Sequence, residues 1–236
     1  MLHQIIRADE RGRKDIGWLK SNFSFSFSSY ANPQRSGFGL LRTFNDDFVT
    51  PGKGFGLHAH VNMEIISVML AGRMNHKDSM GYSEVVEKDW VQIMSAGTGL
   101  RHEEYNVGEE NVNFLQIWIE PKMPNIAPRY QRRQFPEEKR KNALVPVVSN
   151  EEGQGHCWIN QNARLSLGYF EAGQRVDYDL NPLNKGVFIF NIGGQLSIEG
   201  NGIGPRDSIG LWDTPHVTIA CATESRFLII EAPINH

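Results

Sequence analysis

The chain has 236 residues, 40% of them hydrophobic and 22% charged, which is the composition of an ordinary globular protein with one large β domain or two modest ones. A formal net charge of −3 argues against an electrostatic nucleic-acid binder, so we expect no direct nucleic-acid binding. The sequence has no apolar run that could span a bilayer and no secretory signal, so we expect a cytoplasmic protein without membrane association. Cys157 and Cys221 lie far apart and are expected to be reduced thiols.

Short apolar segments separated by glycine, without a sustained helical period, indicate an all-β chain built as a sandwich or barrel. The expected strands include residues 23–27, 63–70, 90–94, 114–119, 186–192 and 227–230. Residues 121–146 are rich in proline and charge and predict an exposed connector, with a helical turn around residues 136–142. The basic residues of this connector leave open a local patch for an acidic partner.

A weak internal repeat predicts two similar β units in tandem. In the first half, the apolar segment 65–70 is followed by 90–93 and then by 114–119, which ends in Glu120-Pro121. The second half repeats this order with segments 187–192, 208–212 and 227–230. We therefore expect three parts: an N-terminal barrel over residues 1–125, a connector over 126–145 and a C-terminal barrel over 146–236.

Two histidines, His58 and His60, lie two residues apart in a glycine-rich segment that is predicted to be a strand. Because residues i and i+2 of a strand point to the same face, both imidazoles would face a barrel interior. His102 and Glu104 follow a glycine-punctuated turn and share a face by the same rule, while Glu103 points away. Three nitrogens and one carboxylate oxygen suit a transition metal. The sequence therefore predicts a metal site formed by His58, His60, His102 and Glu104.

A second carboxylate, that of Glu64, leaves the choice of the acidic ligand open. Glu64 follows His60 by four residues, about 13 Å on a straight strand, so it reaches the same metal only if the chain bends. The carboxylate that is not a ligand is expected to orient a ligand histidine as a hydrogen-bond acceptor. His76, His156 and His216 stand alone in the sequence, and we expect structural or surface roles for them.

Residues 58–64 resemble the first cupin motif and residues 97–106 the second. A more specific resemblance, to the pirin family, is carried by residues 17–19, 23–27, 45–47, 51–56 and 78–81. Pirins are bicupins, so the resemblance implies two tandem cupin (jelly-roll-like) antiparallel β-barrels. In pirins, three histidines and a glutamate hold the metal, and they map here onto His58, His60, His102 and Glu104. The second pirin barrel is typically metal-free, and residues 176–180 contain no histidine at the corresponding place.

The resemblance also implies a cofactor and an activity. The cofactor would be one divalent transition-metal ion, Fe(II) by preference, with Ni, Cu, Mn or Zn as alternatives, and four protein donors would leave about two open positions on it. Several bacterial pirins are similar in activity to quercetin 2,3-dioxygenase, which opens a flavonol with dioxygen and releases carbon monoxide. The partners would then be a flavonol and dioxygen, with Glu104 as general base, in a monomeric protein.

Two other functions are compatible with the same resemblance. Some pirins act as regulators, so the chain could be a redox-sensing interaction protein in which the metal's oxidation state alters a surface that a protein partner reads. A bicupin that uses the metal only for stability is the third alternative. The fold and the metal site do not separate these functions.

Overall fold

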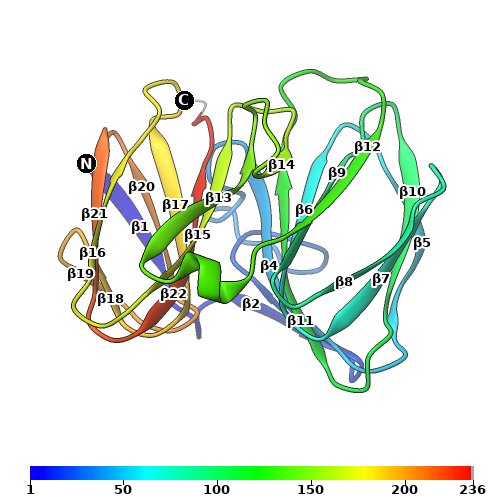
Figure 1. The fold of residues 1–236 in the computed structure, drawn as a ribbon, viewed down its shortest axis with the longest axis horizontal. Coiled ribbons are helices and arrows are strands. Elements are labelled where there is room, and N and C mark those ends of the chain that lie inside the picture. The colour runs from blue at the N-terminus through cyan, green and yellow to red at the C-terminus, as the bar shows by residue number, and fades with distance from the viewer. Residues whose placement is uncertain (235–236) are drawn as a thin grey trace.

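The structure is a computed structural model that describes residues 1–234 and consists of two β units side by side (Figure 1). Each unit packs a seven-stranded sheet face to face with a four-stranded sheet within the described chain. The predicted all-β jelly-roll architecture is therefore confirmed. The two units are open sheet pairs, however, and their strands are not hydrogen-bonded into continuous closed barrels.

The N-terminal unit holds the strands that carry the predicted metal ligands. Its larger sheet has the hydrogen-bonded order β12 (Arg129–Gln134), β9 (Trp90–Ser95), β6 (Glu64–Ala71), β11 (Val112–Ile119), β4 (Leu41–Val49), β3 (Leu19–Phe23) and β2 (Gly12–Asp15). Its smaller sheet has the order β5 (Gly54–His60), β10 (Leu100–Asn106), β7 (Arg73–Asp78) and β8 (Ser83–Glu87).

The C-terminal unit repeats this arrangement strand by strand. Its larger sheet has the order β1 (Leu2–Ile6), β20 (Ser208–Trp212), β17 (Gly186–Gly193), β22 (Ser225–Glu231), β15 (Arg164–Phe170), β13 (Ala143–Ser149) and β14 (Cys157–Trp158). Its smaller sheet has the order β16 (Arg175–Asp179), β21 (His216–Cys221), β18 (Leu196–Ile198) and β19 (Asn201–Ile203). By position in these orders, β16 and β21 are the counterparts of β5 and β10.

Two strands pair with sheets other than those expected from their place in the sequence. The first strand, β1, pairs with β20 and so belongs to the C-terminal unit, while β12, inside the predicted connector, pairs with β9 of the N-terminal unit (Figure 1). The prediction of a strand over residues 23–27 is wrong beyond Phe23, where β3 ends. The chain turns there because Phe25 packs against Phe188 in the core between the units, while Phe27 packs against Trp118.

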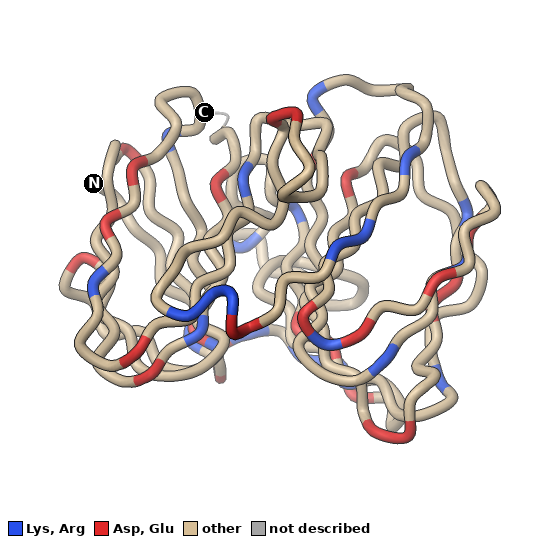
Figure 2. Tube along the Cα trace, in the orientation of Figure 1, with Lys and Arg blue, Asp and Glu red and all other residues tan. Residues whose placement is uncertain are grey.

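The connector is less exposed than the sequence predicts. The expected helical turn is present as a short 3-10 helix, η1 (Glu137–Arg140), but the Arg140 side chain is buried against Asp89. Arg132 pairs with Glu84, and Lys141 pairs with Glu171. In Figure 2 a basic stretch, an acidic stretch and a second basic stretch follow one another along this segment. These ion pairs argue against a free basic patch for an acidic partner.

The inner and outer faces of the larger N-terminal sheet have different surroundings. On β4, Asn45 and Asp47 face the interior of the N-terminal unit, whereas Phe44 faces the other unit and packs against Phe188 and Phe190. This alternation follows from the two-residue period of a strand. It leaves one face of the sheet to hold the units together and the other to line a cavity.

No helix within the described residues is long and apolar enough to cross a membrane.

Candidate metal centre

Strands β5 and β10 bring the predicted ligands together. They pair antiparallel, and His58 lies opposite His102 in the register. The close approach of the two strands depends on Gly54, because a Cβ atom there would lie 2.1 Å from the backbone oxygen of Glu104. The spacing of the two motifs in the sequence thus becomes proximity in space.

The side chains of β10 alternate as the sequence predicts. His102 and Glu104 are both buried at 2% exposure and line a cavity together with His58 and His60. Glu103 points the other way, where its carboxylate lies 3.9 Å from Lys77 Nζ. The four predicted ligands therefore face one space.

The histidine geometry fits a shared metal ion. His60 Nε2 and His102 Nε2 lie 3.1 Å apart, and ring nitrogens of His58, His60 and His102 all lie within 4.8 Å of one another. Two nitrogens bound at right angles, each about 2.1 Å from an ion, would be separated by roughly 3 Å. His58 Nδ1 lies 2.8 Å from the carbonyl oxygen of Gly56, so Nε2 is the ring nitrogen left free.

The protonation state of these imidazoles also suits metal binding. Burial, together with the neighbouring imidazoles, lowers the pKa of His60 to about 4, and that of His102 falls to about 4 for the same reasons. Both rings are therefore neutral near pH 7, and the neutral ring is the form that offers a lone pair to a metal.

Glu104 is held by residues that the sequence reasoning did not connect with it. Gln92 Nε2 donates a hydrogen bond to Glu104 Oε1 at 2.5 Å, and the Tyr130 hydroxyl donates to Gln92 Oε1 at 3.0 Å. His76 Nδ1 lies 3.8 Å from Glu104 Oε1, and its Nε2 lies 2.8 Å from Asp78 Oδ2. The Tyr130 ring stacks on His76 with their centroids 4.3 Å apart. His76 is thus part of the centre, and His76, His102 and Glu104 form a second group that could hold a metal ion.

The charges around Glu104 balance one another. Burial alone would raise the pKa of Glu104, but the nearby His76 and His102 hold it below its usual range. Burial alone would lower the pKa of His76, but the carboxylates of Glu104 and Asp78 raise it above its usual range. The result is an anionic Glu104 beside an imidazole whose pKa is raised.

The expectation that Glu64 orients a ligand histidine is wrong. Its Oε2 accepts hydrogen bonds from the Ser95 hydroxyl at 2.7 Å and from the backbone N–H of Asn160 at 3.2 Å. The two-residue period of β5 does not extend to Glu64, because His60 ends β5 and Glu64 begins β6. Asn62, between them, has a left-handed conformation (φ 48°). Glu64 therefore links the N-terminal unit to the Asn160 segment.

A cavity of about 280 Å³ extends from the predicted ligands. Most of the surface that faces the cavity is apolar, although polar side chains around it, even without the four predicted ligands, are as numerous as apolar ones. The residues around it, besides the four predicted ligands, are Lys14, Leu19, Ser21, Phe23, Phe27, Ser28, Asn45, Asp47, Phe55, Ile65, Gln116 and Trp118. An apolar surface with polar groups at fixed positions is common in the small-molecule sites of proteins.

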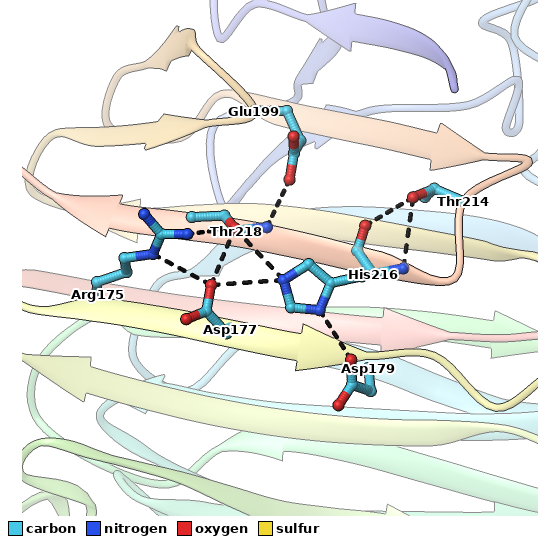
Figure 3. Close-up of polar contacts among 7 residues, drawn as sticks. All are labelled: Arg175, Asp177, Asp179, Glu199, Thr214, His216 and Thr218. Atoms are coloured by element: carbon cyan, nitrogen blue, oxygen red, sulfur yellow. Dashed lines mark hydrogen bonds and ion pairs between the residues drawn. The ribbon is translucent and has the colours of Figure 1, made fainter.

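The equivalent place in the C-terminal unit is packed with apolar side chains. On β16 and β21, Tyr178 and Val217 lie opposite each other and face the core. The polar residues of these strands face outward, where His216 lies between Asp177 and Asp179, at 3.4 Å and 2.8 Å from their carboxylate oxygens (Figure 3). His216 thus has the surface role that the sequence predicts.

The fold and the site define a bicupin in which, among the residues that the structure describes, the histidine-rich cavity lies in the N-terminal unit. Residues 6–119 match the family model described as Pirin, and residues 146–232 match that of the quercetinase C-terminal cupin domain. The chain belongs to the pirin family.

Three similar proteins cover nearly the whole chain. Quercetin 2,3-dioxygenase of Escherichia coli (strain K12) is 36% identical over 228 residues, which are 96% of this chain and 97% of that protein. A pirin-like protein of Caulobacter vibrioides is 34% identical over 95% of this chain and 97% of its own length. The solved structure of the bacterial pirin YhhW from Escherichia coli in complex with nickel(II) has a TM-score of 0.94 and 34% identity, covering 99% of this chain and 100% of that one.

Proposed function

We propose that the protein is a metal-dependent dioxygenase that opens the ring of quercetin or a related flavonol with dioxygen and releases carbon monoxide. The observation that carries the proposal is the position of three imidazoles and a carboxylate on the wall of a cavity that also carries the aromatic rings of Phe23, Phe27, Phe55 and Trp118. The likeness to a protein named quercetin 2,3-dioxygenase along almost the full chain supports this reaction.

The residues proposed to hold the metal are His58, His60, His102 and Glu104. We propose iron(II) as the ion used in the cell, with nickel, copper, manganese or zinc able to occupy the same donors. The nickel(II) complex of the similar bacterial pirin supports a divalent ion. When bound, the ion would act as a Lewis acid toward the 3-hydroxyl group of the flavonol and lower the pKa of that group.

Glu104 is proposed as the base that accepts the proton of the 3-hydroxyl group. Its carboxylate is anionic at neutral pH because His76 and His102 hold its pKa below the usual range in spite of burial. Gln92 engages Oε1 of this carboxylate and fixes its orientation. The aromatic walls would keep bulk water from the substrate while it reacts with dioxygen.

An oxygen-dependent assay tests the proposal. Protein loaded with iron(II) without oxygen is mixed with quercetin, and the flavonol absorbance is followed before and after oxygen is admitted. We expect loss of quercetin only after oxygen enters, and no loss with the His58→Ala variant. A fully metal-loaded protein that leaves quercetin intact would contradict the proposal and favour the regulatory alternative.

We also propose that the protein is cytoplasmic and monomeric. Light scattering measures its mass in solution and so tests the monomer.

A further inference from the structure

A row of polar side chains crosses the inner face of the larger N-terminal sheet. The register places Asn45 opposite Gln116, Gln116 opposite Ser67, and Ser67 opposite Gln92, on four adjacent strands. Asp47 lies two residues beyond Asn45 and lines the same cavity. Buried positions are mostly apolar in proteins, and a polar group placed there is expected to have a hydrogen-bond partner.

One end of the polar row has its partners within the protein. Gln92 Nε2 lies 3.3 Å from Ser67 Oγ and 2.5 Å from Glu104 Oε1, and Gln92 Oε1 accepts the Tyr130 hydroxyl. This end of the row therefore serves the proposed metal centre by orienting its carboxylate.

The other end of the row has polar atoms that lack such partners. Asn45 and Asp47 are 2% and 4% exposed, and Oδ1 of each has no hydrogen-bond partner within the described part of the chain. The Trp118 Nε1–H group, on the same cavity wall, is also unpartnered there. Because buried polar atoms without partners are unfavourable, these side chains would gain hydrogen bonds by turning toward a ligand in the cavity that they line.

The walls between the two ends suit a flat aromatic molecule. The centroid of the Trp118 ring lies 5.2 Å from that of His60 and 5.3 Å from that of Phe27, and both pairs meet edge to face. Phe27 in turn packs on Phe23, with centroids 5.4 Å apart. These rings fix one another and form an apolar wall that runs from a proposed metal ligand toward Asn45, which lies opposite Phe23 in the sheet.

We infer that Asn45 and Asp47 form a second recognition subsite, which binds phenolic hydroxyl groups on the part of the substrate that lies away from the metal. The inference rests on the proposed function and narrows its substrate class to polyhydroxylated flavonols. Asn45 Oδ1 and Asp47 Oδ1 are acceptors and phenolic hydroxyls are donors, so their hydrogen bonds are complementary.

The charge of the subsite supports a neutral polyphenol over an acidic ligand. Burial raises the pKa of Asp47 to about 7, so its carboxyl group is present in both protonation states near neutral pH. Either state can bond to a hydroxyl group, since the protonated form donates and the ionised form accepts. A carboxylate or phosphate group on the ligand would be repelled by the ionised form.

Binding measurements on the metal-loaded protein test the inference. The protein is loaded with nickel(II) and kept free of oxygen, and tryptophan fluorescence reports the Kd of quercetin and of 3-hydroxyflavone, which lacks the other hydroxyl groups. We expect quercetin to bind roughly tenfold more tightly, the effect of one or two hydrogen bonds. Equal Kd values would overturn the inference without any variant being made.

Two variants locate the effect. Asn45→Leu and Asp47→Leu remove the acceptors, and each is expected to weaken quercetin binding several-fold while changing 3-hydroxyflavone binding less than about twofold. The matched control is Thr43→Val, a buried position on the same strand that does not line the cavity. If the leucine variants do not fold, Asn45→Asp and Asp47→Asn keep an acceptor and are expected to keep the preference.

Turnover separates this inference from the proposed function. Preferential binding of quercetin that depends on Asn45 and Asp47, without consumption of any flavonol in the iron(II)-loaded protein, would support the subsite and contradict the dioxygenase proposal. Consumption of both flavonols with equal kcat/KM, unchanged in the leucine variants, would support the dioxygenase and overturn the subsite.

Discussion

Glu104 receives support from strands on both sheets of the N-terminal unit. Gln92 comes from β9, His76 from β7 and His102 from β10 itself. Such residues around a ligand fix its orientation and its charge, and replacing them commonly costs about 10 to 100-fold in metal affinity. Metal affinity is therefore expected to respond to three changes: loss of the Glu104 carboxylate, loss of the His76 imidazole and a fall in pH.

The first concerns the carboxylate itself. Glu104→Gln removes an anionic donor and is expected to reduce metal affinity by at least roughly tenfold, as measured by competition with a chelator. Glu103→Gln is the matched control, because Glu103 faces Lys77 on the opposite side of the strand. Full metal retention by Glu104→Gln at the chelator concentration that strips half of the Glu103→Gln protein would contradict the proposed ligand set.

The second concerns His76, which does not need to touch the metal to matter. His76→Gln removes the imidazole that lies between Asp78 and Glu104, and we expect about a 10 to 100-fold loss of metal affinity with an unchanged circular dichroism spectrum. His216→Gln, on the outer surface of the C-terminal unit, should bind metal as the parent does. Equal affinities of the two variants would show that His76 is only a packing residue.

The third concerns pH. The pKa values of His60 and His102 are lowered to about 4, below the ordinary value of 6.5, so these rings stay neutral as the pH falls through 6. Metal should therefore remain bound in dialysis down to about pH 5 and be lost below it, because protons then compete for the ring nitrogens. A midpoint of metal loss near pH 6.5 would contradict the burial of these rings.

Strand pairing converts two short motifs into one site. The two-residue period of a strand, applied to His58, His60, His102 and Glu104, suffices to predict from sequence that these side chains share a cavity. His76 and Gln92 could not be found in this way, because their place depends on which strands are neighbours. Glu64 was misplaced because a strand end and a left-handed residue between it and His60 interrupt the period.

A prediction at the level of the strand pair concerns Gly54. In Gly54→Ala the new methyl group would meet the Glu104 backbone and push β5 away from β10, so we expect loss of metal binding with most of the β structure retained. Gly56→Ala is the control on the same strand, since its Cβ would meet nothing closer than the Tyr105 hydroxyl at 3.6 Å. Elemental analysis of both purified variants tests this, and normal metal content in Gly54→Ala would refute it.

The two units share one arrangement of strands, and the proposed metal centre lies in the N-terminal unit. The repeat in the sequence predicted the two units. It did not predict that β1 pairs with the C-terminal unit or that β12 pairs with the N-terminal unit, because short edge strands have little sequence pattern. Buried polar contacts join the units as well: Asp46 pairs with Arg11 at 3.3 Å and with Arg206 at 3.0 Å. Since Tyr178 and Val217 occupy the inner face of β16 and β21, the counterparts of the strands that carry the proposed ligands, we expect one metal ion and one active centre in each chain.

The ratio of carbon monoxide released to quercetin consumed shows whether the metal centre opens the flavonol ring. Oxidation by a loosely held metal also consumes quercetin, so the Glu104→Gln variant is needed to measure that background. For the iron(II)-loaded protein we predict about one carbon monoxide per quercetin, and almost none from Glu104→Gln under the same conditions. Loss of quercetin without carbon monoxide, or equal release from the Glu104→Gln variant, would contradict a flavonol-opening centre built on His58, His60, His102 and Glu104.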